Sequence, residues 1–148
     1  MMDRKLQIFI SSTYTDLKEE RQQVVEAVLN AGHIPAGMEL FKAGASQEAT
    51  IERWIEESDI YLLMVGARYG SLHESGISYT EWEYNLAEKL NKPMFSLVFQ
   101  DEYIEERVIS RIITSKENER SNPIFKSFIQ KLSSNPTISG TWCNRYVH

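Results

Sequence analysis

The chain has 148 residues, of which 42% are apolar and 25% are charged, and its formal net charge is −5. These values fit one soluble globular domain, and nucleic-acid binding is not expected because the sequence contains no run of like charges. A single cysteine, Cys143, excludes an internal disulfide, and with no signal peptide and no apolar run long enough for a membrane span we expect a cytoplasmic protein that does not enter the membrane.

The first hundred residues alternate between strand patterns and helix patterns. Apolar, β-rich runs predict strands at residues 5–11, 33–38, 60–66 and 94–99. Residues at helical spacing predict helices between them, and these residues are Leu17, Arg21, Val24, Val25, Val28 and Leu29 in the first helix, Ile51, Trp54, Ile55 and Ser58 in the second, and Tyr79, Trp82, Leu86 and Leu90 in the third. We expect Gly32 to end the first helix, Ser46 or Gln47 to open the second, and Pro93 to end the third.

This order predicts an α/β fold with a central parallel sheet and helices on both faces. Pro35 predicts an edge position for the second strand, because proline cannot donate to the ladder. Further helices are predicted near 103–116 and 123–133. Ligands of such sheets bind beyond the carboxyl ends of the strands, which here carry Ser11–Thr13, Phe41–Gly44 and Gly66–Ser71.

Two glutamates, Glu81 and Glu83, stand near the start of the third helix. A helical wheel places Glu83 on the flank of the predicted buried stripe and Glu81 on the hydrated side. Ser78 and Glu81 also fit a capping box, although a rival box through Thr80 would make Glu83 the structural residue. A half-buried carboxylate requires either a catalytic role or an ion pair, for which Arg68 and Arg21 are the candidates.

Four stretches together resemble a bacterial TIR-like (Toll/interleukin-1 receptor-like) domain family, and they are IFISSTYTDLKEER, GMELF, ESDIYLLMVGARYGS and SYTEWEYNLAEKLNKP. The spacing of Glu83, Ala87 and Lys92 also resembles a register shared by NAD-cleaving TIR domains and nucleoside deoxyribosyltransferases. The resemblance implies a three-layer flavodoxin-like or TIR-like fold. It implies one domain over residues 1–148, with a core at about 5–100 and a C-terminal part at 101–148, as the N-terminal domain of a larger protein.

The resemblance also implies an activity, which is cleavage of the bond between nicotinamide and ribose in NAD⁺ with Glu83 as the catalytic residue. The substrate-binding residues expected by carry-over are Ser11, Ser12, Thr13, Phe41, Gly44, Gly66, Arg68, Tyr69 and Ser78. Neither a cofactor nor a metal is expected, since NAD⁺ is the substrate. Several of these residues also have structural interpretations: Ser11–Thr13 can cap the first helix, Phe41 can be a core residue and Tyr69 can belong to a turn. Asp16 and Arg21 are expected to form an intrahelical or loop-anchoring pair, and Trp54 and Trp82 are expected to lie in the core.

The sequence departs from the TIR pattern before Glu83, where Thr80-Glu81-Trp82 replaces the usual tryptophan-cysteine pair. The product is therefore left open among ADP-ribose, a cyclic isomer and a transferred ADP-ribosyl group. The family also implies a homo-oligomer or a TIR–TIR assembly that acts in signalling or antiphage-type defence. Two alternatives are a non-catalytic self-association module and a nucleoside deoxyribosyltransferase-like N-glycosidase with Glu83 as nucleophile.

Overall fold

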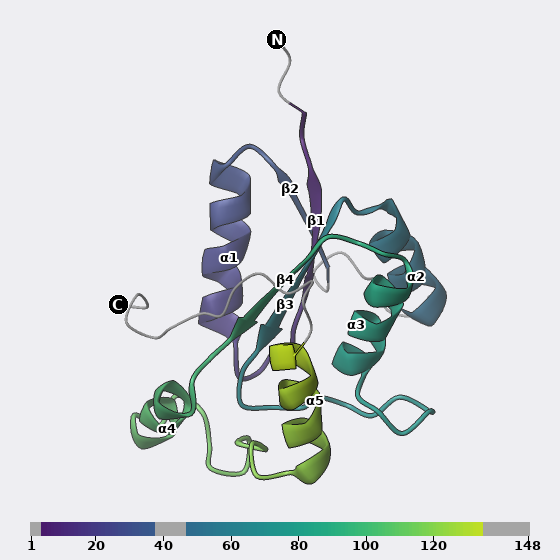
Figure 1. Ribbon diagram of the computed structural model, residues 1–148. Helices are drawn as coiled ribbons and strands as arrows, with labels where there is room; N and C mark the ends of the chain where they lie inside the picture. Colours follow the sequence, from purple (N-terminus) through teal and green to yellow (C-terminus); the bar gives the residue numbers. More distant parts are fainter. Residues whose placement is uncertain (1–3, 38–46, 135–148) are drawn as a thin grey trace.

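The computed structural model describes residues 4–37 and 47–134, and the statements below concern this part of the chain. Strands and helices alternate up to the fourth strand, and two helices follow it (Figure 1). In chain order the elements are β1 (Gln7–Ser11), α1 (Lys18–Asn30), β2 (Ile34–Gly37), α2 (Gln47–Glu57), β3 (Ile60–Val65), α3 (Tyr79–Lys89), β4 (Met94–Val98), α4 (Asp101–Ile109) and α5 (Pro123–Ser134).

All four strands form one parallel sheet in the order β2-β1-β3-β4. The predicted α/β class is therefore confirmed, and the order is that of flavodoxin-like folds. Pro35 lies in the edge strand β2, as predicted, and the most apolar strand, β3, lies inside the sheet. The chain leaves β1 and β3 toward opposite faces, so the switch point of the sheet lies between the carboxyl ends of these two strands.

Alternation along the strands builds a separate core on each face of the sheet. Phe9, Tyr61 and Leu63 pack with residues of α2, α3 and α5, whereas Ile10 and Met64 pack with residues of α1 and α4. Figure 1 shows α1 on one side of the sheet and α2 and α3 on the other. Because Ser11 follows Phe9 by two residues, its side chain belongs to the α2/α3 face.

Helix ends follow from local backbone chemistry, with one correction to the predictions. Gly32 has the positive φ of 85° that follows the end of α1, as expected. Helix α3, however, ends at Lys89 and not at Pro93. Asn91 takes a φ of 56°, and its N–H and that of Lys92 donate to the carbonyls of Glu88 and Ala87. This pair of bonds is a Schellman motif, which terminates the helix before the proline is reached.

Two further predictions need correction. Leu29, placed on the buried stripe of the first helix, is 55% exposed because the helix packs on the sheet through Leu17, Val24, Val25 and Val28. The helix predicted near 103–116 covers only Asp101–Ile109, since Arg111 adopts a φ of 59° and turns the chain away. The helix predicted at 123–133 is confirmed as α5.

Candidate functional site

A serine and a glutamate from distant parts of the chain meet beside the end of β1. The Ser11 hydroxyl donates to Glu83 Oε1 over 2.6 Å, although the two residues are 72 positions apart. Ser11 is the last residue of β1, and Glu83 lies in the first half of α3. The pair therefore lies at the carboxyl end of the sheet, where ligands of this fold bind.

The start of α3 determines which glutamate turns inward. Ser78 is the N-cap, and its hydroxyl oxygen accepts from Glu81 N–H over 3.1 Å, which confirms the first capping frame and excludes the one through Thr80. With the helix starting after Ser78, its buried residues are Thr80, Tyr84 and Ala87. Glu83 shares their face by the i, i+3, i+4, i+7 rule and thus lies nearer the centre of the buried side than predicted. The predicted stripe of Tyr79, Trp82, Leu86 and Leu90 is only partly buried and forms the flank.

Burial changes the proton affinity of Glu83. The side chain is half-buried, and loss of water raises its pKa from 4.5 to about 7. The hydrogen bond from Ser11 and the positive charge of Arg21 both oppose that rise. A carboxyl group with this pKa exists in both protonation states near neutral pH, as expected for a group that participates in chemistry.

Glu81 has a different environment, although it lies only two residues earlier. Its Oε1 accepts the hydroxyl of Tyr69 over 2.6 Å, so the side chain is half-buried and not on a hydrated face as predicted. The Tyr69 ring is 3% exposed and packs on Phe125 and Phe128 of α5. Tyr69 is therefore a core residue in this structure, and its predicted part in substrate binding stays a prediction.

Arg21 fixes the end of β1 from the α1 side. Its guanidinium donates to the Ser12 hydroxyl over 2.9 Å and to the Ile10 carbonyl over 3.0 Å. It also lies against Gly37, where an added Cβ would come within 2.5 Å of Nη2. Ser12 is thus part of the scaffold around the Ser11–Glu83 pair, and Arg21 anchors the end of β1. The predicted pairing of Arg21 with Asp16 stays a prediction.

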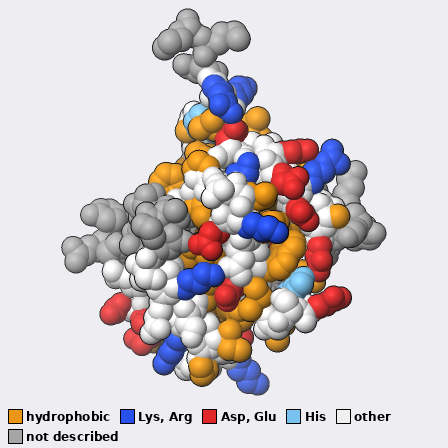
Figure 2. Space-filling view, turned by 45° about the vertical axis from the view of Figure 1, so that its right-hand side comes forward, with side chains coloured by type: hydrophobic (Ala, Val, Ile, Leu, Met, Phe, Trp, Pro, Cys, Tyr) orange, Lys and Arg blue, Asp and Glu red, His pale blue; other side chains and the backbone are white. Residues whose placement is uncertain are grey.

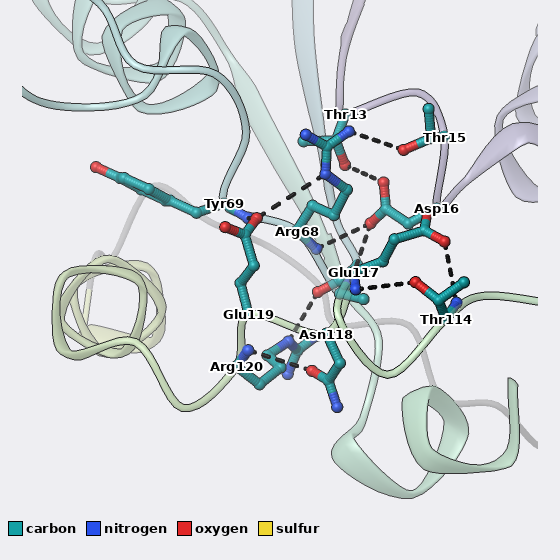
Figure 3. A network of polar contacts seen from close by, with 12 residues as sticks. Thr13, Thr15, Asp16, Arg68, Tyr69, Thr114, Glu117, Asn118, Glu119 and Arg120 are labelled. Carbon is teal, nitrogen blue, oxygen red and sulfur yellow. Dashed lines mark hydrogen bonds and ion pairs between the residues drawn. The ribbon is translucent and has the colours of Figure 1, made fainter. Parts of the chain in front are cut away.

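Asp16 joins the loops that follow β1 and β3 (Figure 3). Its Oδ1 accepts the Thr13 hydroxyl over 2.6 Å, and its Oδ2 accepts the N–H groups of Ala67 and Arg68 over 2.9 and 3.0 Å. Gly66 permits this approach, because a Cβ there would lie 2.7 Å from Asp16 Oδ2. Thr13 and Gly66 therefore hold the two loops together, and the predicted anchoring role of Asp16 is confirmed.

Arg68 lies at the outer edge of the same network, where its side chain is 31% exposed. The guanidinium donates to Thr15 Oγ1 over 2.7 Å and lies 3.9 Å from Glu119 Oε1. These contacts leave part of its surface open to solvent, and its predicted role in substrate binding stays a prediction.

Residues 117–120, which lie outside every predicted element, belong to the same polar network (Figure 3), and Arg120 covers the ends of β3 and β4. Arg120 donates to the carbonyls of Gly66 over 2.7 Å and Phe99 over 2.6 Å, and it bonds Asp101 over 2.9 Å. Glu119 accepts Tyr69 N–H over 3.0 Å. No sequence motif marks such a segment, because Arg120 bonds to carbonyls that lie 21 to 55 positions earlier in the chain.

The loop between β3 and α3 is attached to α2 by a histidine. His73 Nδ1 accepts Ser75 N–H over 3.0 Å, so Nε2 carries the proton and donates to Glu48 over 2.7 Å. The ring also stacks on Trp82 with 5.3 Å between centroids. Contacts of His73 with α2 and α3 therefore hold this loop in place.

A family model described as "Domain of unknown function (DUF4062)" matches residues 7–146. The chain belongs to this family. None of the curated proteins matches the chain. Among solved structures, the CMP N-glycosidase BcmB of Clostridium botulinum is similar with a TM-score of 0.45 and 18% identity, over 86% of this chain and 98% of that one. Similarity at this level does not determine an activity.

The remaining predicted site residues have varied positions relative to Glu83. Ser78 is fully buried as the cap of α3, whereas Phe41 and Gly44 lie outside the described residues. Lys92, the last residue of the register shared with the two enzyme groups, donates to the carbonyls of Glu56 and Ser58 at the end of α2. That contact is structural. The TIR-like relationship itself stays a prediction.

Charged side chains of both signs are interspersed over the face shown in Figure 2, and no large area of one sign is visible there. Across residues 4–37 and 47–134, His, Cys, Asp and Glu side chains do not gather in a group of three that could hold a metal ion. Within the same ranges no helix has the length and apolar character needed to cross a membrane.

Proposed function

We propose that this DUF4062 domain is an N-glycosidase that cleaves the bond between a base and the ribose of a nucleoside or nucleotide, with Glu83 as the catalytic carboxylate. The observation that supports it is the Glu83–Ser11 pair at the carboxyl end of the sheet. A half-buried carboxyl with a pKa near 7 is costly for a fold to keep, and catalysis explains its retention. The register of Glu83 and Ala87 on α3 also matches that of the NAD-cleaving and deoxyribosyl-transferring groups that the sequence resembles.

The chemistry requires a negative charge close to the anomeric carbon. As the bond to the base breaks, the base leaves with the bonding electron pair and the ribose ring becomes an oxocarbenium ion. An ionised Glu83 stabilises this ion or adds to its anomeric carbon, and water then takes the sugar and loses a proton. The Ser11 hydroxyl orients the carboxylate by donating to one of its two oxygens. NAD⁺ is a favourable substrate because nicotinamide leaves from a cationic pyridinium and needs no strong acid.

The decisive experiment measures base release by the purified domain at several protein concentrations, because the resemblance implies activation by assembly. The substrates are NAD⁺, CMP and the other nucleoside 5′-monophosphates, and 2′-deoxynucleosides. We expect one class to lose its base, and Glu83→Gln to lower the rate at least about 1000-fold. Glu81→Gln is the matched control on the same helix and is expected to keep the rate within several-fold. Equal rates for Glu83→Gln and wild type, or no base release at any concentration, would contradict the proposal.

The pH dependence of the rate gives a second test. Because ionised Glu83 is the active form and its pKa is about 7, kcat/KM is expected to rise tenfold per pH unit below that value and to level off above it. The measurement is kcat/KM from pH 5 to 9 on the substrate found above. A profile that is flat through pH 6–8 would show that ionisation of Glu83 does not limit the reaction.

A further inference from the structure

Tyr61 of β3 lies on the same face of the sheet as the Ser11–Glu83 pair. It is opposite Phe9 in the parallel register, and their rings stack with 5.9 Å between centroids and an interplanar angle of 8°. On the helix side it contacts the ring of Tyr84, the neighbour of Glu83, at 6.5 Å. Tyr61 is 1% exposed, so its ring is a full member of the core between β1 and α3.

The hydroxyl of Tyr61 is buried and has no hydrogen-bond partner among the described residues. Two other buried tyrosines do have one, since Tyr69 donates to Glu81 and Tyr103 donates to Glu20. An unpaired buried hydroxyl destabilises a fold, and phenylalanine would fill the same space without that cost. The hydroxyl therefore has a use that this arrangement of the side chains does not show.

The groups around this hydroxyl indicate what that use is. The Ser11 hydroxyl lies near enough to lower the pKa of Tyr61 but is not in hydrogen-bonding geometry with it. Burial is the largest cause of the raised pKa of Tyr61. Electrostatic interactions with Glu83 and Tyr84, both on α3, raise this pKa further. On the α1 side, Arg21 is the positive group that acts on Glu83. Tyr61 thus keeps its proton and remains a donor when Glu83 ionises.

We propose that Tyr61 is a positioning residue for Glu83, whose hydroxyl donates to Ser11 Oγ when the Glu83 carboxylate becomes negatively charged. Ser11 already donates to Glu83 Oε1, so the three groups then form one chain of donors that ends on the charge. Such a chain strengthens each bond in it. A small movement of the Ser11 or Tyr61 side chain is required to bring the two oxygens into hydrogen-bonding geometry, and Glu83 releases its proton to solvent. The role rests on the proposed function, but its first test does not depend on activity.

The test is Tyr61→Phe, which removes only the hydroxyl. The Glu83 pKa is read by NMR of protein labelled with ¹³C at the glutamate carboxyl, with Glu83→Gln assigning the signal. We expect the pKa to rise by about 0.5–1 unit in Tyr61→Phe and by more in Ser11→Ala. In the Ser11→Ala background, Tyr61→Phe should add little, because the bond acts through Ser11. Tyr103→Phe, which removes a paired hydroxyl on the other face, is the control and should leave the Glu83 pKa unchanged.

Three results would overturn the inference: an unchanged Glu83 pKa in Tyr61→Phe, effects that add fully in the double variant, or a Tyr61→Phe protein that melts several degrees below wild type at pH 5. The last result would mean that the hydroxyl already has a partner in the fold. A shifted pKa in a protein that releases no base would sustain the role of Tyr61 and refute the proposed function. Where activity is found, the rise of kcat/KM should move to higher pH by the same amount as the NMR pKa.

Discussion

Glu83→Gln is expected to make the protein more stable at pH 8 while it removes base release. Below pH 4.5 the folded and unfolded chains both hold the Glu83 proton, so this group adds no pH dependence. Between pH 4.5 and about 7 the unfolded chain loses the proton first, and stability falls as pH rises. Above pH 7 Glu83 is ionised in both states, and its burial lowers the free energy of unfolding by about 3 kcal/mol. Glutamine carries no charge, and its oxygen can still accept the Ser11 hydroxyl.

The measurement is the free energy of unfolding from denaturant titrations at pH 5 and pH 8. Glu83→Gln should exceed wild type by about 3 kcal/mol at most at pH 8 and by much less at pH 5. Stability gained where activity is lost is the signature of a site that the fold maintains at a cost. Glu81→Gln is the control and should not show this pH-dependent gain. A Glu83→Gln protein less stable than wild type at pH 8 would contradict the raised pKa and the assignment based on it.

Asp16→Ala is expected to lower the free energy of unfolding by about 3 kcal/mol. The change leaves the buried N–H of Ala67 and the N–H of Arg68 without their acceptor, and it removes the partner of the Thr13 hydroxyl. Asp16→Asn should lower the free energy of unfolding by almost as much. The NH₂ group of asparagine would replace one of the two carboxylate oxygens, and an NH₂ group cannot accept a hydrogen bond from Thr13, Ala67 or Arg68. Both variants loosen the two loops at the switch point of the sheet.

Asp101→Ala and Thr13→Val serve as reference variants for the stability loss in Asp16→Ala. Asp101 forms an ion pair with Arg120, and its side chain is 73% exposed. We expect Asp101→Ala to lower the free energy of unfolding by less than about 1 kcal/mol. Thr13→Val removes one donor and keeps the shape, so its effect should lie between those of Asp101→Ala and Asp16→Ala. Urea unfolding at pH 7 measures all of them. If Asp16→Ala were no worse than Asp101→Ala, the loops would not depend on the Asp16 carboxylate.

The sequence determined the fold class because the fold depends on local patterns. Apolar runs and helical spacing identified the strands, Pro35 identified the edge, and Gly32 identified the end of α1. Local patterns did less well where two signals competed. Pro93 was expected to end α3, but the backbone at Asn91 ends it earlier, since a left-handed residue closes the last turn before the proline.

Glu83 could be preferred to Glu81 as the candidate from the sequence alone, although the helical wheel placed the buried stripe one position away. Hydrophobic spacing gives the period of a helix but not its rotation on the sheet, which the packing of Thr80, Tyr84 and Ala87 decides. That rotation carries Glu83 to Ser11 and turns Glu81 toward Tyr69.

Only the tertiary structure assigned the partners of these residues. The hydroxyl of Ser11, the uncommitted hydroxyl of Tyr61 and the guanidinium of Arg120 acquire their roles from groups far away in the chain. The physical reason is that burial and hydrogen bonding set a pKa and a contact, and both depend on which segments are packed together. From the sequence Glu83 could be identified as a candidate, whereas its proton affinity and its neighbours were decided by the fold.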